Sequence, residues 1–407
     1  MNRVAVTGLG LVCALGNNVS ECWTRLTAGE TGIRQLRDPG SPPYKFQVGA
    51  EAWYFDAAEH FSEKDLLMLE RFAQLAVVAA REAILQSGLS FDGELADRFA
   101  VITGSSVGGQ FSEEEGYRRL YRENMPRVGP LTIPRTMSNA GASRITLEFG
   151  IHGPAYTVST ACSSSNHAIG QAFWMIRSGQ VTAALAGGSE AVFAEGLIRA
   201  WEAMRVVSPD VCRPFSADRR GLSLGEGAGM VVLENWEHAR ARGAEILGEI
   251  AGFGMSSDAH HITQPCAEGA VKAMRWALKD GQVAPEEIGY INAHGTGTQA
   301  NDVTETQAIR AVFSENADRL LVSSTKSMHG HTLGAAGAIE AAATLLALKH
   351  GVIPPTANFT CPDPACNLNV VANQPCAARI DAALSNTFAF GGLNATLVMR
   401  RSENGRI

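Results

Sequence analysis

Cys162 lies between a predicted strand and a predicted helix, a position that suits a nucleophile. Residues 155–161 are small, β-branched or aromatic, and they predict a buried strand that ends at the cysteine. Apolar residues recur at helical spacing from Ala168 through Trp174 and Ile176, which predicts a helix. The unpaired N–H groups and the dipole of a helix N-terminus favour a thiolate there. Such a thiolate could hold an acyl group as a thioester, although a single cysteine can equally be buried and inert.

Two glycine-rich loops, each directly after a predicted strand, contain histidines. The first reads N-A-H-G-T-G-T over residues 292–298 and contains His294. The second reads S-T-K-S-M-H-G-H over residues 324–331 and contains His329 and His331. Because α/β folds place their chemistry in loops at strand ends, both loops are candidate sites. The two loops together with the cysteine make a sharper case for catalysis than any one of these features alone.

Two charged residues beside the second histidine loop are expected to pair. Lys326 precedes His331 in that loop, and Glu340 lies in a helix that the sequence predicts over residues 335–349. If this helix folds back onto the loop, the Lys326 ammonium and the Glu340 carboxylate could pair beneath the site. An ion pair in that position would keep the site balanced in charge.

The composition excludes several classes of function. The chain has 407 residues, 45% of them hydrophobic, and a net charge of −7, which argues against a nucleic-acid partner. No run of about 18 apolar residues appears, so no membrane span is predicted. The eight cysteines are scattered without zinc-site spacing, and the glycine-rich loop at 104–109 lacks the Lys-Ser/Thr pair of a phosphate loop. We therefore expect a cytoplasmic protein with no metal, no cofactor and no membrane association.

Strands alternate with helices along the chain, which predicts an α/β fold with a largely parallel sheet. One helix is predicted over residues 62–86, with Ser62 as its N-cap and Gly88 just after its end. Near residue 250 the order of elements begins again. We therefore expect two similar halves, residues 1–250 with the cysteine and residues 251–407 with the two histidine loops.

Five motifs give the chain a resemblance that spans nearly its whole length. They are T-A-C-S-S at 160–164, G-M-S-S-D-A at 254–259, N-A-H-G-T-G-T at 292–298, T-K-S-M-H-G-H at 325–331 and N-T-F-A-F-G-G-L-N at 386–394. With them the chain resembles the β-ketoacyl-[acyl-carrier-protein] synthases, condensing enzymes of the thiolase superfamily, and most closely the KAS II type. The resemblance implies a thiolase-like fold of five αβαβα layers, built from two pseudo-duplicated halves, and a dimer.

The resemblance also implies a reaction, the decarboxylative condensation of a malonyl group with a cysteine-bound acyl chain. Cys162 would carry the acyl chain, while His294 and His331 would act on the malonyl group. The N–H groups of Cys162 and Phe390 would form an oxyanion hole, with Phe390 gating access to the sulfur. The other implied site residues are the supporting pair Lys326 and Glu340 and the substrate contacts Val107, Thr296, Thr298, Phe388, Gly391 and Gly392.

Three features depart from the family pattern. His329 stands where the family often has threonine, although the register of the motif favours His331 as the catalytic residue. Leu67 and Met68 occupy helix positions that are basic in housekeeping enzymes, and the loop at 206–212 is shorter. These departures favour a specialised pathway, such as polyketide or aryl polyene synthesis, over bulk fatty-acid synthesis.

The partners follow from the same resemblance. An acyl carrier protein would deliver both substrates, and the dimer would be a homodimer or a heterodimer with a chain-length-factor-like chain. The apolar pair Leu67 and Met68 predicts a dedicated carrier or a protein contact, because docking of an acidic carrier depends on charge and exposed apolar residues often mark interfaces. Alternatively the pair faces the core, and the carrier contacts come from arginines, namely Arg118, Arg119, Arg122 or Arg205.

Two other functions compete with this interpretation. A degradative thiolase would need a second acid/base cysteine in a Cys-x-Gly setting late in the chain, but Cys376 precedes Ala377 and Ala378. A non-catalytic chain-length factor would lack the nucleophile, whereas Cys162 is present. Both alternatives are therefore disfavoured.

Overall fold

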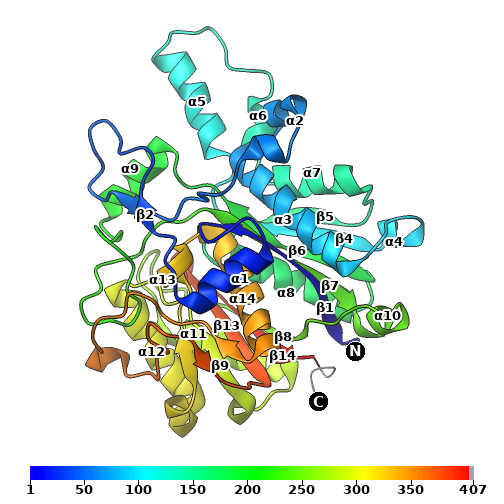
Figure 1. The fold of residues 1–407 in the computed structure, drawn as a ribbon, viewed down its shortest axis with the longest axis vertical. Helices are drawn as coiled ribbons and strands as arrows, with labels where there is room; N and C mark the ends of the chain where they lie inside the picture. The colour runs from blue at the N-terminus through cyan, green and yellow to red at the C-terminus, as the bar shows by residue number, and fades with distance from the viewer. Residues whose placement is uncertain (403–407) are drawn as a thin grey trace.

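A ten-stranded sheet runs through the computed structural model, which describes residues 1–402 (Figure 1). Every residue of β1 is buried, and β1 lies next to the middle of the sheet. From one edge to the other the strands are β5 (Ala155–Val158), β4 (Phe99–Gly104), β6 (Ala183–Glu190), β7 (Gly227–Asn235), β1 (Val4–Cys13), β8 (Gly248–Ser257), β14 (Leu393–Arg401), β13 (Ala382–Ala389), β9 (Ile288–Asn292) and β10 (Leu321–Ser323).

The sheet consists of two five-stranded parts with the same topology. When the strands of each part are numbered along the chain, both parts read third, second, fourth, fifth, first from the outer edge inward. The parts join where β1 pairs antiparallel with β8, for instance Val4 opposite Ile250. The order of elements therefore does repeat in the second half of the chain, as the sequence predicts.

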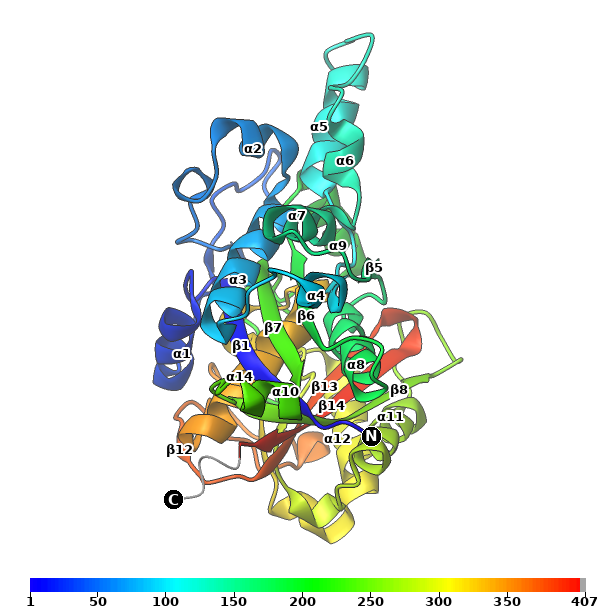
Figure 2. The ribbon, with the colours of Figure 1, turned by 90° about the vertical axis from the view of Figure 1, so that its right-hand side faces the viewer.

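Helices and the two parts of the sheet form five layers, which Figure 2 shows from top to bottom. The middle layer contains α8 (Ser164–Arg177) and α14 (Ala336–His350), which contact strands of both parts. The outer layers contain α3 (Arg71–Ser87) and α7 (Ala140–Phe149) on one side, and α11 (Ala267–Gly281) and α12 (Gln299–Phe313) on the other. This arrangement agrees with the predicted αβαβα fold.

The middle of the molecule is closely packed because small residues let the layers approach. Residues 336–348 of α14 are all buried, and many of them are alanines. On the outer side of β1, a Cβ added to Gly10 would lie 1.8 Å from the carbonyl oxygen of Ala79 in α3. Glycine is therefore required at that position for the helix to lie directly on the strand.

The remaining elements are short and lie mostly outside the layers. In Figure 1, α5, α6 and α2 lie at the top of the molecule, and Figure 2 shows α5 and α6 as a projecting arm with α2 apart from it. The helices are α1 (Val19–Ala28), α2 (Glu63–Met68), α4 (Glu94–Asp97), α5 (Gln110–Tyr121), α6 (Thr132–Thr136), α9 (Glu195–Met204), α10 (Trp236–Ala241) and α13 (Lys326–His329). The 3-10 turns and two-residue strands are η1 (Ala57–Glu59), η2 (Pro285–Glu287), η3 (Ser314–Asp318), η4 (Leu333–Ala335), η5 (Pro364–Cys366), η6 (Phe390–Gly392), β2 (Arg34–Gln35), β3 (Val48–Gly49), β11 (Val352–Ile353) and β12 (Cys376–Ala377).

The structure corrects three sequence predictions. The sheet is mixed, because β1, β7, β8 and β14 pair antiparallel with their neighbours, and alternation of strands and helices does not fix strand direction. The predicted helix over 62–86 is two helices, α2 and α3, because the Glu70 carboxylate accepts the N–H of Phe72 and begins a new helix. The strand before Cys162 is not buried, because β5 is an edge strand with partly exposed residues.

Between residues 1 and 402, no helix is both long and apolar enough to cross a membrane.

Candidate active site

Cys162 lies in the tight turn that joins β5 to α8. The turn is made by Ala161, which has a left-handed φ of +50°, and α8 begins at Ser164, earlier than the helical spacing from Ala168 predicts. The carbonyl oxygen of Ala161 accepts hydrogen bonds from the hydroxyls of Ser106 and Ser164. These contacts fix the turn, and they leave the cysteine almost fully buried beside the N-terminus of a helix, as predicted.

The resting thiol of Cys162 is protonated, which corrects the prediction of a thiolate. Burial raises the pKa of this thiol to about 11. The Lys326 ammonium and the backbone N–H groups of Phe390 and Cys162 act in the opposite direction, but burial outweighs them. The Cys162 thiolate is therefore not present in the free enzyme and must form during the reaction, when the thiol loses its proton.

His294 is held by its backbone at the end of β9. The Glu305 carboxylate accepts the N–H of His294 at 2.8 Å and that of Gly295 at 2.7 Å. The ring nitrogen Nδ1 of His294 is buried and has no hydrogen-bond partner within residues 1–402. Burial lowers the pKa of His294 well below 6.5, with smaller effects from Lys326 and His331, so the ring is neutral.

His331 has a defined tautomer. Its Nδ1 accepts a hydrogen bond from the N–H of Leu333 at 3.2 Å, so a neutral ring must carry its proton on Nε2. The pKa of His331 is lowered well below 6.5, first by burial and then by Lys326. The rings of His294 and His331 lie nearly perpendicular, with centroids 5.5 Å apart. His331 therefore lies beside His294 and has an Nε2–H that can act as a donor.

The predicted ion pair of Lys326 and Glu340 is present, and both side chains are fully buried. Lys326 begins α13 and Glu340 lies in α14, so the pair joins the second histidine loop to the middle layer. Burial raises the pKa of Glu340, while the Lys326 ammonium lowers it. With its partner so close, we assign Glu340 the charged form.

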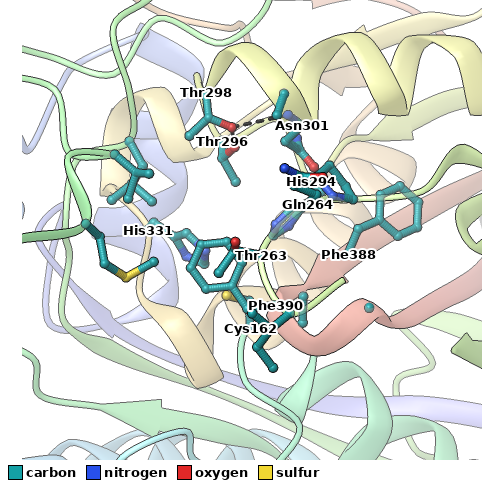
Figure 3. A pocket seen from close by; sticks show the side chains of 18 of the residues that line it. Cys162, Thr263, Gln264, His294, Thr296, Thr298, Asn301, His331, Phe388 and Phe390 are labelled. Carbon is teal, nitrogen blue, oxygen red and sulfur yellow. Dashed lines mark hydrogen bonds between the residues drawn. The ribbon is translucent and has the colours of Figure 1, made fainter. Parts of the chain in front are cut away.

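Cys162 and the two histidines open into one cavity of about 200 Å³ (Figure 3). The cavity brings together most of the predicted site residues, whose side chains come from both halves of the chain. Those that line it are Cys162, His294, Thr296, Thr298, His331, Phe388, Phe390 and Gly392. Lys326 and Glu340 lie outside the lining, as expected for a supporting pair.

Two predicted substrate contacts lie away from the cavity wall. The N–H of Val107 points to the Glu190 carboxylate at 3.3 Å, in a loop that the cavity does not reach. Gly391 has a φ of +82° and donates its N–H to the carbonyl oxygen of Ile262 at 2.7 Å. Gly391 therefore ties the turn of Phe390 to a neighbouring loop rather than forming the wall itself.

Several lining residues were missed by sequence reasoning. Trp201 and Met204 in α9 line the cavity, and the Trp201 ring stacks on Phe390 with centroids 6.1 Å apart. Asn301 and the loop at 261–265 also contribute. The loop could have been found, because it directly follows the G-M-S-S-D-A motif, whereas nothing in the sequence near Trp201 indicates its contact with Phe390.

His329 lies outside this cavity. Its Nε2 is 3.0 Å from the hydroxyl of Thr325, and its side chain is fully buried. Burial lowers the pKa of His329 to about 3, so the ring is neutral. His331 alone of the two neighbouring histidines lines the cavity, which agrees with the register of the motif.

No cluster of histidine, cysteine or acidic side chains in the described part of the chain could hold a metal ion. The cavity nevertheless combines a thiol, two neutral imidazoles and backbone N–H groups at one place. Such a set can accept an acyl group on sulfur and stabilise oxygen atoms that become negative during a reaction.

Comparison with known proteins gives consistent results over most of the chain. Residues 1–239 match the family model for the N-terminal domain of β-ketoacyl synthases, and residues 247–360 match the model for the C-terminal domain. Nodulation protein E of Rhizobium sp. (strain N33) is 46% identical over 400 residues, covering 98% of this chain and 99% of that protein.

Two further comparisons point the same way. The 3-oxoacyl-[acyl-carrier-protein] synthase 2 of Staphylococcus aureus (strain N315) is 38% identical over 408 residues, covering 98% of this chain and 99% of that protein. The solved structure of the ishigamide ketosynthase/chain length factor superposes with a TM-score of 0.93 at 36% identity, covering 98% of this chain and 99% of that one.

The raised pKa of Cys162 predicts how its alkylation depends on pH. With a pKa of about 11, the thiolate fraction rises about tenfold per pH unit between pH 7 and pH 10. We expect the iodoacetamide rate at Cys162, followed on its peptide by mass spectrometry, to rise in the same way. The exposed Cys361 serves as an internal control. A plateau in the Cys162 rate below pH 8.5 would contradict the assignment of a protonated thiol.

The buried ion pair predicts a non-additive effect on stability. Glu340→Gln leaves the Lys326 charge buried without its partner, which should lower the free energy of unfolding by about 3 kcal/mol or more. The double variant Lys326→Met with Glu340→Gln removes the stranded charge and should recover part of this loss. Urea unfolding of the two single variants and the double variant measures the coupling. Strict additivity of the two losses would show that the pair does not act as a unit.

Proposed function

The chain belongs to the β-ketoacyl synthase family and is a condensing ketosynthase, and we propose that Cys162, His294 and His331 carry out its reaction. The observation that carries the proposal is the single cavity in which the thiol faces two neutral histidines. Neutral imidazoles are donors without a charge of their own, so they suit an oxygen that becomes negative only during the reaction.

The first step loads the enzyme. The Cys162 sulfur attacks the thioester carbonyl of an acyl chain, forming a new C–S bond and breaking the bond to the incoming thiol. The proton of Cys162 leaves with that thiol, which accounts for a nucleophile that is protonated at rest. The N–H groups of Cys162 and Phe390, which lower the thiol's pKa, can also hold the oxygen of the tetrahedral intermediate.

The second step generates the carbon nucleophile. The bond between the malonyl carboxylate and the α-carbon breaks, carbon dioxide leaves, and the electron pair moves into the thioester enolate. The enolate oxygen then accepts the Nε2–H of His331, whose tautomer is fixed by Leu333. His294 lines the same cavity, with its ring centroid 5.5 Å from that of His331, and would supply the second donor from Nε2, because its Nδ1 is buried.

In the third step the α-carbon attacks the acyl thioester on Cys162. A C–C bond forms, the C–S bond breaks, and the Cys162 thiolate leaves and recovers a proton. The product is a β-ketoacyl thioester extended by two carbons.

Two other functions are less well supported by the residues that line the cavity. A chain-length factor would have no nucleophile there, whereas Cys162 is present, and a degradative thiolase would need a second acid/base cysteine beside it.

We place the enzyme in a specialised pathway, such as polyketide or polyene synthesis. Nodulation protein E and the ishigamide ketosynthase, to which the chain is similar, both support a role outside bulk fatty-acid synthesis. Leu67 and Met68 are 64% and 44% exposed, so the alternative that they face the core is wrong. An exposed apolar pair on α2 supports a dedicated acyl carrier protein or another protein contact there.

We propose a dimer, homomeric or with a chain-length-factor-like chain, in which the free edge of β5 pairs with the partner. A division near residue 250 is supported by the identical strand order of the two parts. A cytoplasmic location is supported by the eight cysteines, all of which are free.

Removal of the nucleophile tests the core of the proposal. Cys162→Ala should abolish condensation and leave no acyl group on the protein after incubation with acyl-loaded carrier, because no other thiol of residues 1–402 lines the cavity. Intact-protein mass spectrometry measures the adduct, and Cys361→Ala, which removes an exposed thiol, should load normally. A stable acyl adduct on the Cys162→Ala protein would overturn the assignment.

The two neighbouring histidines should differ in decarboxylation. His331→Ala removes the Nε2–H donor from the cavity and should slow carbon dioxide release from malonyl-loaded carrier by a factor of about 100 or more. His329→Ala should change the rate far less, because that ring bonds Thr325 outside the cavity. Equal losses in both variants, with both proteins folded, would leave His331 without its proposed role.

Exposure of the apolar pair predicts carrier preference. The enzyme should elongate acyl groups on a housekeeping carrier several-fold more slowly than on a pathway-specific one. Leu67→Lys with Met68→Lys should raise the rate on the housekeeping carrier at low salt, because added positive charge speeds encounter with an acidic protein. Leu85→Lys, at an exposed leucine of α3, is the matched control. Equal rates on the two carriers in the unmodified enzyme would contradict the proposal of a dedicated carrier.

A further inference from the structure

One segment of the first half, residues 206–225, contacts both histidine loops; we call it the strap. The N–H of Gly221 donates to the carbonyl oxygen of Gly297 at 3.0 Å, in the first histidine loop. In the second histidine loop, the N–H of His331 donates to the carbonyl oxygen of Ser223 at 2.7 Å. The N–H of Gly225 in turn donates to the carbonyl oxygen of His331 at 3.0 Å. The strap therefore sets the position of both loops relative to one another.

Within the strap, the side chain of Cys212 bonds the backbone of the first histidine loop. Its thiol donates to the carbonyl oxygen of Thr296, with sulfur and oxygen 3.2 Å apart, and its side chain is buried. Burial, assisted by the Asp302 carboxylate, raises the pKa of this thiol to about 12. The sulfur therefore keeps its proton over the working range of the enzyme and acts as a donor rather than a nucleophile.

The same sulfur fills the space beneath Gly297. This glycine has a left-handed φ of +75°, and a Cβ added to it would lie 2.9 Å from the Cys212 sulfur. The N–H of Gly297 is bound by the Asp302 carboxylate at 3.2 Å, and the carbonyl oxygen of Thr298 accepts the Arg219 Nε–H at 3.3 Å. Hydrogen bonds thus hold the backbone of residues 296–298 on the side that faces away from the cavity.

The side chains of Thr296 and Thr298 line the cavity instead. Their hydroxyls lie 2.9 Å apart, and Figure 3 shows them on the wall opposite the Cys162 sulfur. Two paired hydroxyls on a cavity wall offer donors and acceptors to the polar amides of a thioester arm such as pantetheine. Their placement depends on the backbone that Cys212 holds from behind.

We propose that Cys212 is a positioning residue for the thioester arm of the substrate, acting through the backbone of Thr296 and Gly297. The inference rests on the proposed function, because it assumes that the arm lies along Thr296 and Thr298. Loss of the sulfur would leave the carbonyl oxygen of Thr296 without this donor and open space under a glycine, so the loop would sample other conformations. Binding of the arm would weaken, while the distance between Cys162 and the histidines would be kept by the rest of the strap.

The test compares substitutions at Cys212 in steady-state kinetics with malonyl-pantetheine and an acyl-loaded carrier. Cys212→Ala removes both the donor and the volume, and we expect KM for malonyl-pantetheine to rise about fivefold with kcat within twofold of the unmodified enzyme. Cys212→Ser keeps a donor and should restore KM to within twofold. Cys366→Ala, at a buried cysteine outside the cavity lining, is the matched control and should change neither constant.

The outcomes separate positioning from simple packing. Equal KM values for Cys212→Ala and Cys212→Ser, an unchanged KM in Cys212→Ala, or a fall in kcat alone would each overturn the proposal. If Cys212→Ala does not fold, Cys212→Val fills the space without a donor and is compared with Cys212→Ser in the same way. Absence of condensation in the unmodified enzyme would instead refute the proposed function, so the two failures are distinguishable.

Discussion

The site depends on one interaction, the buried ion pair between the Lys326 ammonium and the Glu340 carboxylate. The Lys326 side chain is fully removed from solvent and is balanced by the equally buried carboxylate of Glu340. The ammonium lowers the pKa values of His294 and His331, after burial itself, and it also lowers that of the Cys162 thiol. A single charge thus favours neutral imidazoles and a stabilised sulfur anion, which are the two conditions that this chemistry needs.

The helix that carries Glu340, α14, is covered on both sides because it contacts strands of both halves of the chain. The middle layer of α8 and α14 brings the N-terminus that flanks Cys162 and the carboxylate of Glu340 to the same place. The strap from the first half then bonds the backbones of both histidine loops from the second half. Neither half alone contains the site, so its geometry is a property of the packing between them.

The sequence was informative wherever chemistry has a local signal. Histidines in glycine-rich loops after strands, and a cysteine before a helix, could be recognised from neighbouring residues. The pairing of Lys326 with Glu340 was expected on the condition that the helix over residues 335–349 folds back onto the second histidine loop, and the ion pair is present. The ionisation of Cys162 could not be predicted, because burial outweighs the helix N-terminus and depends on distant residues. Trp201 and Cys212 were missed for the same reason, since each meets its partner, Phe390 or Thr296, only in the folded chain.

The most direct test of this account is the protonation state of the two cavity histidines in the free enzyme. Selective ¹⁵N labelling of histidine, with resonances assigned by single substitutions, reports charge and tautomer for each ring. The account predicts that His294 and His331 stay neutral at pH 6.5 and above, where an ordinary histidine is still partly charged, and that His331 carries its proton on Nε2, with Nδ1 as the acceptor from Leu333. A titration of His331 near pH 6.5, or a proton on its Nδ1, would contradict it.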